Sequence, residues 1–173
     1  MTLTLTKLEA AERQLKEAIR MLFERRDPAA VHTLVFASHQ VLYDLCASSK
    51  NSSSLQYSLR DYRYIPEDQR QEWYRLLNSP ANFFKHADRD PNAELTFDPR
   101  MTEAFLLDAT FLYQNLTEDL FHEGAVYRTW FFLKYPQALV ENEFSNVLDS
   151  LRNKIIDPND FTFMRSMLDL RIK

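Results

Sequence analysis

The sequence predicts an all-α protein, a single-domain bundle of about six to eight helices over residues 1–173. Gly124 is the one glycine of the chain, and tight two-residue hairpin turns are hard to build without glycine. Apolar residues recur at helical intervals along much of the sequence. Prolines stand where helices are expected to begin, several of them after an aspartate that can cap the first turn.

The expected helices follow from these signals in chain order. Thr6 and Glu9 have the spacing of a capping box, which places the first helix start. Proline marks the later starts, in the pairs Asp27-Pro28, Asp98-Pro99 and Asp157-Pro158 and at Pro66 and Pro136. The expected spans are residues 6–26, 28–47, 66–78, 80–88, 99–116, 117–134, 136–153 and 158–171. Serine-rich residues 48–64 are expected to form a mobile loop, and residues 88–98 an ordered one.

Composition excludes several classes of protein. The net charge of −4 argues against a general basic surface, so broad DNA binding is not expected. The near absence of glycine excludes phosphate-binding loops, and we predict no cofactor. Cys46 is the single cysteine and the first residues lack a signal-peptide layout, which together predict a cytoplasmic protein. The most apolar run, residues 130–133, is too short to span a membrane.

Residues 82–91 (NFFKHADRDP) combine an amide, cations, an imidazole and carboxylates beside two phenyl rings. On a helix, Asn82 and His86 share one face, with Lys85, Asp88 and Arg89 at its rim. We predict a binding site for an anion or a base, with Lys85 and Arg89 as clamps and Asn82 as orienter. His86 is the hydrogen-bond donor or proton carrier, and thus the candidate catalytic residue. The alternative is a helix end, where Lys85 and His86 neutralise the last carbonyls.

His32 and His39 form a second candidate binding site. Both lie almost on one line at the edge of the broad apolar arc of the helix expected over residues 28–47. Buried imidazoles need hydrogen-bond partners, so the alternative is a pair of satisfied core histidines. If His32, His39 and His86 share one cavity, the prediction of a binding site becomes much stronger.

Residues 82–87 (NFFKHA) resemble the second half of the signature of HEPN domains, small all-helical modules of prokaryotic defence and toxin systems. In that signature an arginine is followed, usually by asparagine and a few residues, by a histidine. For active members the resemblance implies a metal-independent RNase site, formed by arginine and histidine of two subunits. Here Asn82 and His86 match, Ala81 takes the arginine's place, and Arg75 and Arg89 are the nearest arginines. The resemblance therefore implies a degenerate copy that binds rather than cleaves RNA.

Metal binding and oligomerisation leave weaker signals. The chain lacks the paired histidines of zinc proteases, and Asp119-x-x-His122 only approaches the Glu-x-x-His motif of di-iron bundles, so we predict no metal. Residues 130–133 are apolar on every side, and the chain holds eight tyrosines and thirteen phenylalanines. This aromatic surplus predicts a homodimer.

Three classes of function stay open at this point. The leading hypothesis is a bacterial-type HEPN-like module that binds RNA, a nucleotide or a small anionic ligand around residues 82–89. The second is an enzyme, either a metal-independent RNase or a metal-dependent hydrolase built from histidines and carboxylates. The third is a structural or regulatory interaction protein, for which residues 88–98 stay exposed and form no pocket.

Overall fold

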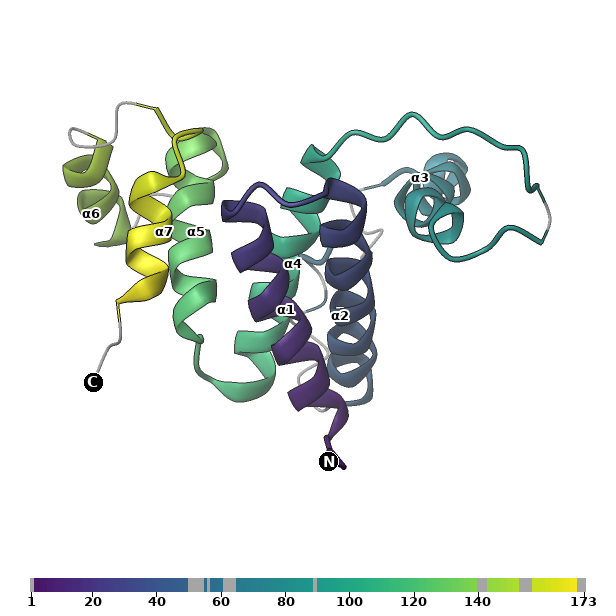
Figure 1. Cartoon of the computed structure of the whole chain (residues 1–173), viewed down its shortest axis with the longest axis horizontal. Coiled ribbons are helices and arrows are strands. Elements are labelled where there is room, and N and C mark those ends of the chain that lie inside the picture. The colour runs from purple at the N-terminus through teal and green to yellow at the C-terminus, as the bar shows by residue number, and fades with distance from the viewer. Residues whose placement is uncertain are drawn as a thin grey trace.

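The computed structural model describes residues 2–49, 55, 57–60, 65–88, 90–139, 143–152 and 157–170, with backbone only for residues 143–147. Within these ranges it contains seven α-helices, two short 3-10 helices and no strand. The predicted all-α fold is confirmed. Figure 1 shows most helices side by side in a bundle, while α3 stands apart at its edge.

Four helices form the centre of the bundle: α1 (Lys7–Phe23), α2 (Pro28–Ser48), α4 (Arg100–Thr117) and α5 (His122–Lys134). The first two lie antiparallel, α4 packs along α2, and α5 lies against α4 and α1 (Figure 1). Two later helices, α6 (Glu143–Arg152) and α7 (Thr162–Asp169), pack against α5. The N-terminal half of the chain thus forms one side of the bundle and the C-terminal helices the other.

Aromatic side chains fill the centre of this bundle. Trp130 is fully buried, with its ring edge-on to Phe23 at 5.6 Å and to Phe161 at 5.7 Å between centroids. The whole apolar run of residues 130–133 is buried within the chain. Because other helices of the same chain cover this run, it no longer supports a homodimer. The homodimer itself stays a prediction.

The first two helix starts are as predicted. Thr6 Oγ1 accepts a hydrogen bond from the Glu9 backbone N–H at 3.1 Å, and Glu9 Oε2 accepts one from the Thr6 N–H at 2.8 Å. This reciprocal pair is a complete capping box. Asp27 Oδ1 accepts from the N–H of Ala29 at 2.9 Å, ahead of a helix that begins with Pro28.

The helices expected over residues 66–78 and 80–88 are replaced by one helix that ends at Phe83, so residues 84–88 are not helical, contrary to the prediction. After a 3-10 turn, η3 (Glu67–Gln69), helix α3 (Arg70–Phe83) runs through Pro80 without a break. Proline removes one helical hydrogen bond, here to the carbonyl of Leu76. Leu76 is an exposed residue, so water can replace that bond, while Pro80 itself is buried. The expected break was therefore wrong.

Three other helices are shorter than expected. Glu118 has a φ of 60° and ends α4, so the next helix begins at His122 instead of residue 117. After Pro136 the described residues 136–139 contain a 3-10 turn, η4 (Pro136–Ala138), and α6 is described from Glu143. Asp157-Pro158 opens a turn, and Asp160 then accepts a hydrogen bond from the Thr162 N–H at 3.0 Å, which starts α7.

The two predicted loops flank α3. Most of residues 48–64 lie outside the described residues. The predicted mobility of this loop therefore stays a prediction. The described residues 58–60 of this loop are bonded to the bundle, as shown below. We call residues 70–97, which comprise α3 and the extended segment after it, the α3 arm. Figure 1 shows this segment looping outward from α3 before it returns to the start of α4.

Candidate functional site

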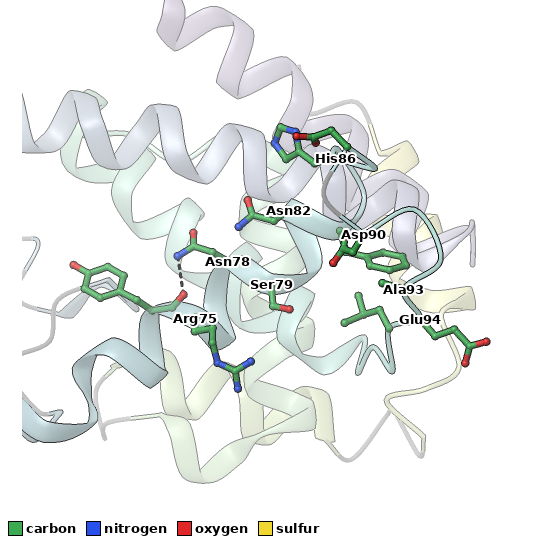
Figure 2. Close-up of a pocket in the computed structure, with 12 residues that line it drawn as sticks. Arg75, Asn78, Ser79, Asn82, His86, Asp90, Ala93 and Glu94 are labelled. Carbon is green, nitrogen blue, oxygen red and sulfur yellow. Dashed lines mark hydrogen bonds between the residues drawn. The ribbon is translucent and has the colours of Figure 1, made fainter.

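A cavity of about 820 Å3 lies between the outer face of α3 and residues 88, 90 and 93–95, and we call it the α3 cavity (Figure 2). Its lining includes Asn82, His86 and Asp88, three of the predicted site residues. The four-residue spacing places Asn82 and His86 one turn apart, and the His86 N–H donates to the Asn82 carbonyl at 3.0 Å. Residues 88, 90 and 93–95 also line the cavity, whereas the structural or regulatory class predicts that residues 88–98 form no pocket.

The side chains of Asn82 and His86 are exposed and make no hydrogen bond to any other described residue. An amide and a neutral imidazole each offer both donors and acceptors. Both groups are therefore available to a molecule that enters the α3 cavity. That they bind a ligand stays a prediction.

Of the two predicted clamp residues, the structure describes Lys85 but not Arg89. Lys85 Nζ lies 5.0 Å from the ring centroid of Phe36, a residue of α2, and does not line the α3 cavity. A cation over a phenyl ring is attracted by the ring face, which turns Lys85 toward the bundle and corrects its predicted role. Arg89 lies outside the described residues, so its role as a clamp stays a prediction.

The inner side of α3 is bonded to the bundle through residues 59 and 60. Arg60 stacks over Phe36, 5.1 Å from the ring centroid, and donates to Asn78 Oδ1 at 3.2 Å. Burial lowers the pKa of its guanidinium. Trp73 Nε1 donates to the Leu59 carbonyl at 2.9 Å. These contacts fix which face of α3 turns outward, and that face borders the cavity.

His32 is fully buried and contacts both ends of the extended segment that follows α3. Its Nδ1 lies 3.0 Å from Thr102 Oγ1. Phe84, at the start of that segment, and Phe97, at its end, contact the His32 ring at centroid distances of 6.0 and 4.9 Å. Burial lowers the pKa of His32 to about 4, and the charge of Lys85 adds to this. His32 is a neutral core imidazole and does not line the α3 cavity.

His39 is also fully buried, with its Nε2 2.7 Å from Asp108 Oδ2. The same oxygen accepts hydrogen bonds from Ser58 Oγ at 2.8 Å and from the Leu59 N–H at 2.9 Å. His39 therefore belongs to a buried network that anchors residues 58–60. The three histidines do not share one cavity, because His32 and His39 lie in the core and His86 lies on the arm.

Sequence reasoning missed Asp108, although a signal was present. Asp108 stands among Phe105, Leu106, Ala109 and Leu112, all buried, so a carboxylate on that apolar face needed buried partners. Arg75, named from the sequence only as one of the two nearest arginines, lines the α3 cavity. Seven residues, or two helical turns, separate Arg75 from Asn82 and place both on one face.

The described lining of the α3 cavity is acidic. Asp88, Asp90 and Glu94 line it together with Arg75. The guanidinium of Arg75 is bonded to both carboxylate oxygens of Glu72, at 2.8 and 2.6 Å. Negative charge in a concave site attracts cations and repels anions.

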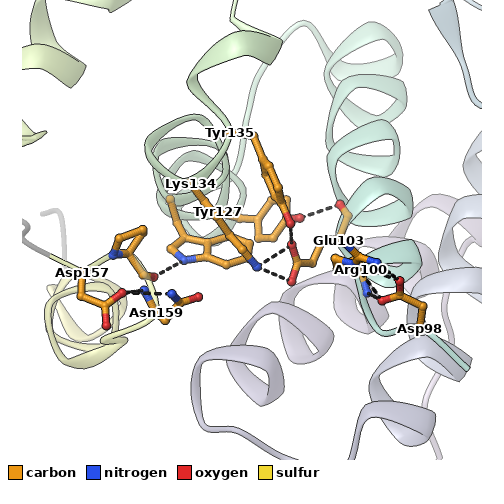
Figure 3. Close-up of polar contacts among 10 residues, drawn as sticks. Asp98, Arg100, Glu103, Tyr127, Lys134, Tyr135, Asp157 and Asn159 are labelled. Carbon is orange, nitrogen blue, oxygen red and sulfur yellow. Dashed lines mark hydrogen bonds and ion pairs between the residues drawn. The ribbon is translucent and has the colours of Figure 1, made fainter.

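A second polar cluster joins α4 to α5 (Figure 3). The carboxylate of Glu103 accepts hydrogen bonds from Lys134 Nζ at 2.7 and 2.9 Å and from the Tyr135 hydroxyl at 2.8 Å. The Tyr127 hydroxyl donates to the Glu103 backbone carbonyl at 2.6 Å. Because both carboxylate oxygens have partners within the chain, this cluster links the two helices and offers little to a ligand.

In the part of the chain that the structure describes, no three His, Cys, Asp or Glu residues form a group that could hold a metal ion. The same residues contain no helix with the length and apolar character needed to cross a membrane. Comparison with protein-family models, with curated proteins and with solved structures gave no match. The HEPN-like resemblance stays a prediction from residues 82–87.

Proposed function

We propose that this protein is a binding module that holds its ligand in the α3 cavity through Asn82 and His86. One observation carries the proposal: both side chains line the same cavity, and neither hydrogen-bonds to another described residue. Polar groups that converge on a hollow are a usual mark of a ligand site. The volume of about 820 Å3 lies within the range of ligand pockets.

The charges around the cavity favour a ligand that carries a positive charge. Asp88, Asp90 and Glu94 would attract a cation, while the phosphates of RNA would meet charge of the same sign. Asn82 and His86 would orient the bound molecule by hydrogen bonds. The earlier expectation of an anionic ligand depended on Lys85 and Arg89 as clamps, and Lys85 is turned toward Phe36.

Binding can be tested with probes of both charges. Isotope-labelled protein is titrated with spermidine, with inorganic phosphate and with a uridine oligonucleotide, while the backbone amide resonances of residues 82–88 are followed. We expect spermidine to shift these resonances, and His86→Ala or Asn82→Ala to weaken its binding about tenfold, the loss of roughly one hydrogen bond.

Asn115→Ala, on α4 and away from the cavity, is the matched control and should bind spermidine like the unchanged protein. If none of the three probes shifts the resonances of residues 82–88, the proposal is wrong. It is equally wrong if a probe shifts them to the same extent in the His86 and Asn82 variants.

RNA cleavage is a second candidate, because Arg75, Asn82 and His86 line the same cavity. Ala81, in the position of the family's arginine, is fully buried, so only an arginine from elsewhere could replace it. In that case His86 would carry the proton and Arg75 would contact the phosphate. Cleavage of labelled RNA that persists with a chelator and disappears in His86→Ala would support this function, and absence of cleavage would contradict it.

A further inference from the structure

Large apolar side chains lie along the outer face of α3. Leu76 is 48% exposed and Phe83 is 39% exposed. They are seven residues apart, so they stand two turns apart on one line of the helix. Such a row of apolar side chains in water is typical of a protein interaction surface.

This row runs between two hollows. Phe83 lines the α3 cavity, and Leu76 lines a second hollow of about 370 Å3 together with Ile65 and Trp73. Paired hollows along an exposed helix can receive apolar side chains that are one or two turns apart on a partner helix. We call this face of α3, with its two hollows, the outer α3 surface.

The rim of the outer α3 surface is strongly acidic. Five carboxylates line the two hollows, namely Asp68, Glu72, Asp88, Asp90 and Glu94. Arg75 is the one cation among the described lining residues, and it is bonded to Glu72. A partner with lysine or arginine beside its apolar residues therefore complements this surface in charge.

We propose that the outer α3 surface docks a basic amphipathic helix of another protein. The inference rests on the proposed function, since it names the class of ligand that occupies the α3 cavity. Helix α3 has 14 residues, about 21 Å at 1.5 Å per residue, and a partner helix of similar length would cover both hollows. Its apolar residues contact Leu76 and Phe83, and its cations face the carboxylates.

A second copy of this chain fits the surface less well. Two copies meeting through the same face of α3 would bring two sets of these carboxylates together, and like charges oppose association. The whole chain also has a net charge of −4. RNA would meet the same repulsion from its phosphates.

Three synthetic peptides of the same 14-residue length as α3 test the proposal. The first combines leucine and lysine with helical periodicity, the second has the same composition in scrambled order, and the third replaces lysine by glutamate. Fluorescence anisotropy measures their binding to the full chain. We expect the periodic lysine peptide to bind about tenfold more tightly than its scrambled isomer, and the glutamate peptide not to bind.

Two variants locate the contact. The double variant Leu76→Ser with Phe83→Ser should remove the preference for the periodic peptide, and Asp88→Asn, Asp90→Asn and Glu94→Gln together should weaken binding about tenfold. The control neutralises three exposed carboxylates elsewhere, Glu17→Gln, Glu118→Gln and Asp169→Asn, and should bind as before.

Equal binding of the periodic and scrambled peptides would overturn the inference, as would equal binding by the double variant. So would a stable dimer through α3 in light scattering, or preferential binding of the uridine oligonucleotide. If no peptide binds while spermidine binding still depends on His86, docking of a basic helix is wrong and the proposed ligand site in the α3 cavity is kept. If the periodic peptide binds His86→Ala and Asn82→Ala as tightly as it binds the unchanged protein, the proposed role of those two residues is wrong.

Discussion

The helical bundle and the α3 arm contain the same kinds of side chain in opposite surroundings. His39 in the bundle is fully buried and bonded to Asp108, while His86 on the arm is exposed. Phe105 is fully buried, whereas Phe83 is 39% exposed. Whether a histidine or phenylalanine stabilises the fold or is available for binding therefore depends on what packs around it. The residue type alone does not determine this.

The two regions also differ in how they are held. Tertiary contacts among α1, α2 and α4 are extensive, whereas α3 meets the bundle at few points. Those points include the Arg60–Asn78 and Trp73–Leu59 bonds and the rings around His32. Segments with few buried contacts open at lower free energy than the core, so the arm is expected to open separately from the bundle.

The largest loss of stability is expected from a substitution of Asp108, which lies in the bundle. Asp108→Ala would leave His39, Ser58 and the Leu59 N–H without their acceptor. We expect the free energy of unfolding in urea to fall by about 4 kcal/mol. Asp44→Ala, at an exposed position of α2, should change it by about 0.5 kcal/mol at most. Similar losses in both variants would remove the distinction between buried and exposed polar groups.

Acidification should destabilise the chain through His32. Its pKa is near 4 in the folded protein, below the ordinary value of 6.5, so the unfolded chain binds the proton more readily. Stability is fully present above pH 6.5 and is lost as the pH falls toward 4, by up to about 3 kcal/mol. Urea unfolding across this range should show a smaller loss in His32→Phe than in the unchanged protein. Parallel pH profiles would contradict this role of His32.

Removing Phe97 should loosen the arm and spare the bundle. Phe97 contacts His32 and Phe84, at centroid distances of 4.9 and 5.5 Å. In Phe97→Ala, hydrogen exchange of α3 amides should report an opening free energy lower by about 2 kcal/mol, with α1 and α2 little changed. Phe163→Ala, at an exposed position of α7, is the control and should leave α3 amides unchanged. Uniform acceleration over all helices would show that arm and bundle unfold as one unit.

The smallest change in stability is expected from substitutions on the outer α3 surface. Leu76→Ser and Phe83→Ser change exposed side chains, so each should alter the free energy of unfolding by about 0.5 kcal/mol at most. Phe105→Ala, in the core, should cost about 4 kcal/mol. Thermal unfolding of the three variants makes the comparison directly. A large loss in either serine variant would mean that these residues stabilise the fold and are not held free for a partner.

Part of the candidate site could be predicted because helical spacing is local. Helix α3 ends at Phe83, but the His86 N–H still donates to the Asn82 carbonyl, so the four-residue interval leaves the two residues about one turn apart, and both line one cavity. Lys85 is only one position from His86, yet it turns toward Phe36 of α2. That choice depends on a residue far away in the chain, which spacing within residues 82–91 does not contain.

The amino-acid order by itself determined the all-α fold and the first helix starts, because capping, proline placement and helical periodicity act within a few residues. Only the tertiary structure decided that α3 continues through Pro80, that His32 and His39 are core residues, and that residues 88, 90 and 93–95 line a cavity beside α3. These outcomes depend on which helix faces meet and on which polar groups lose water there. Such contacts join residues far apart in the chain, and no local pattern specifies them.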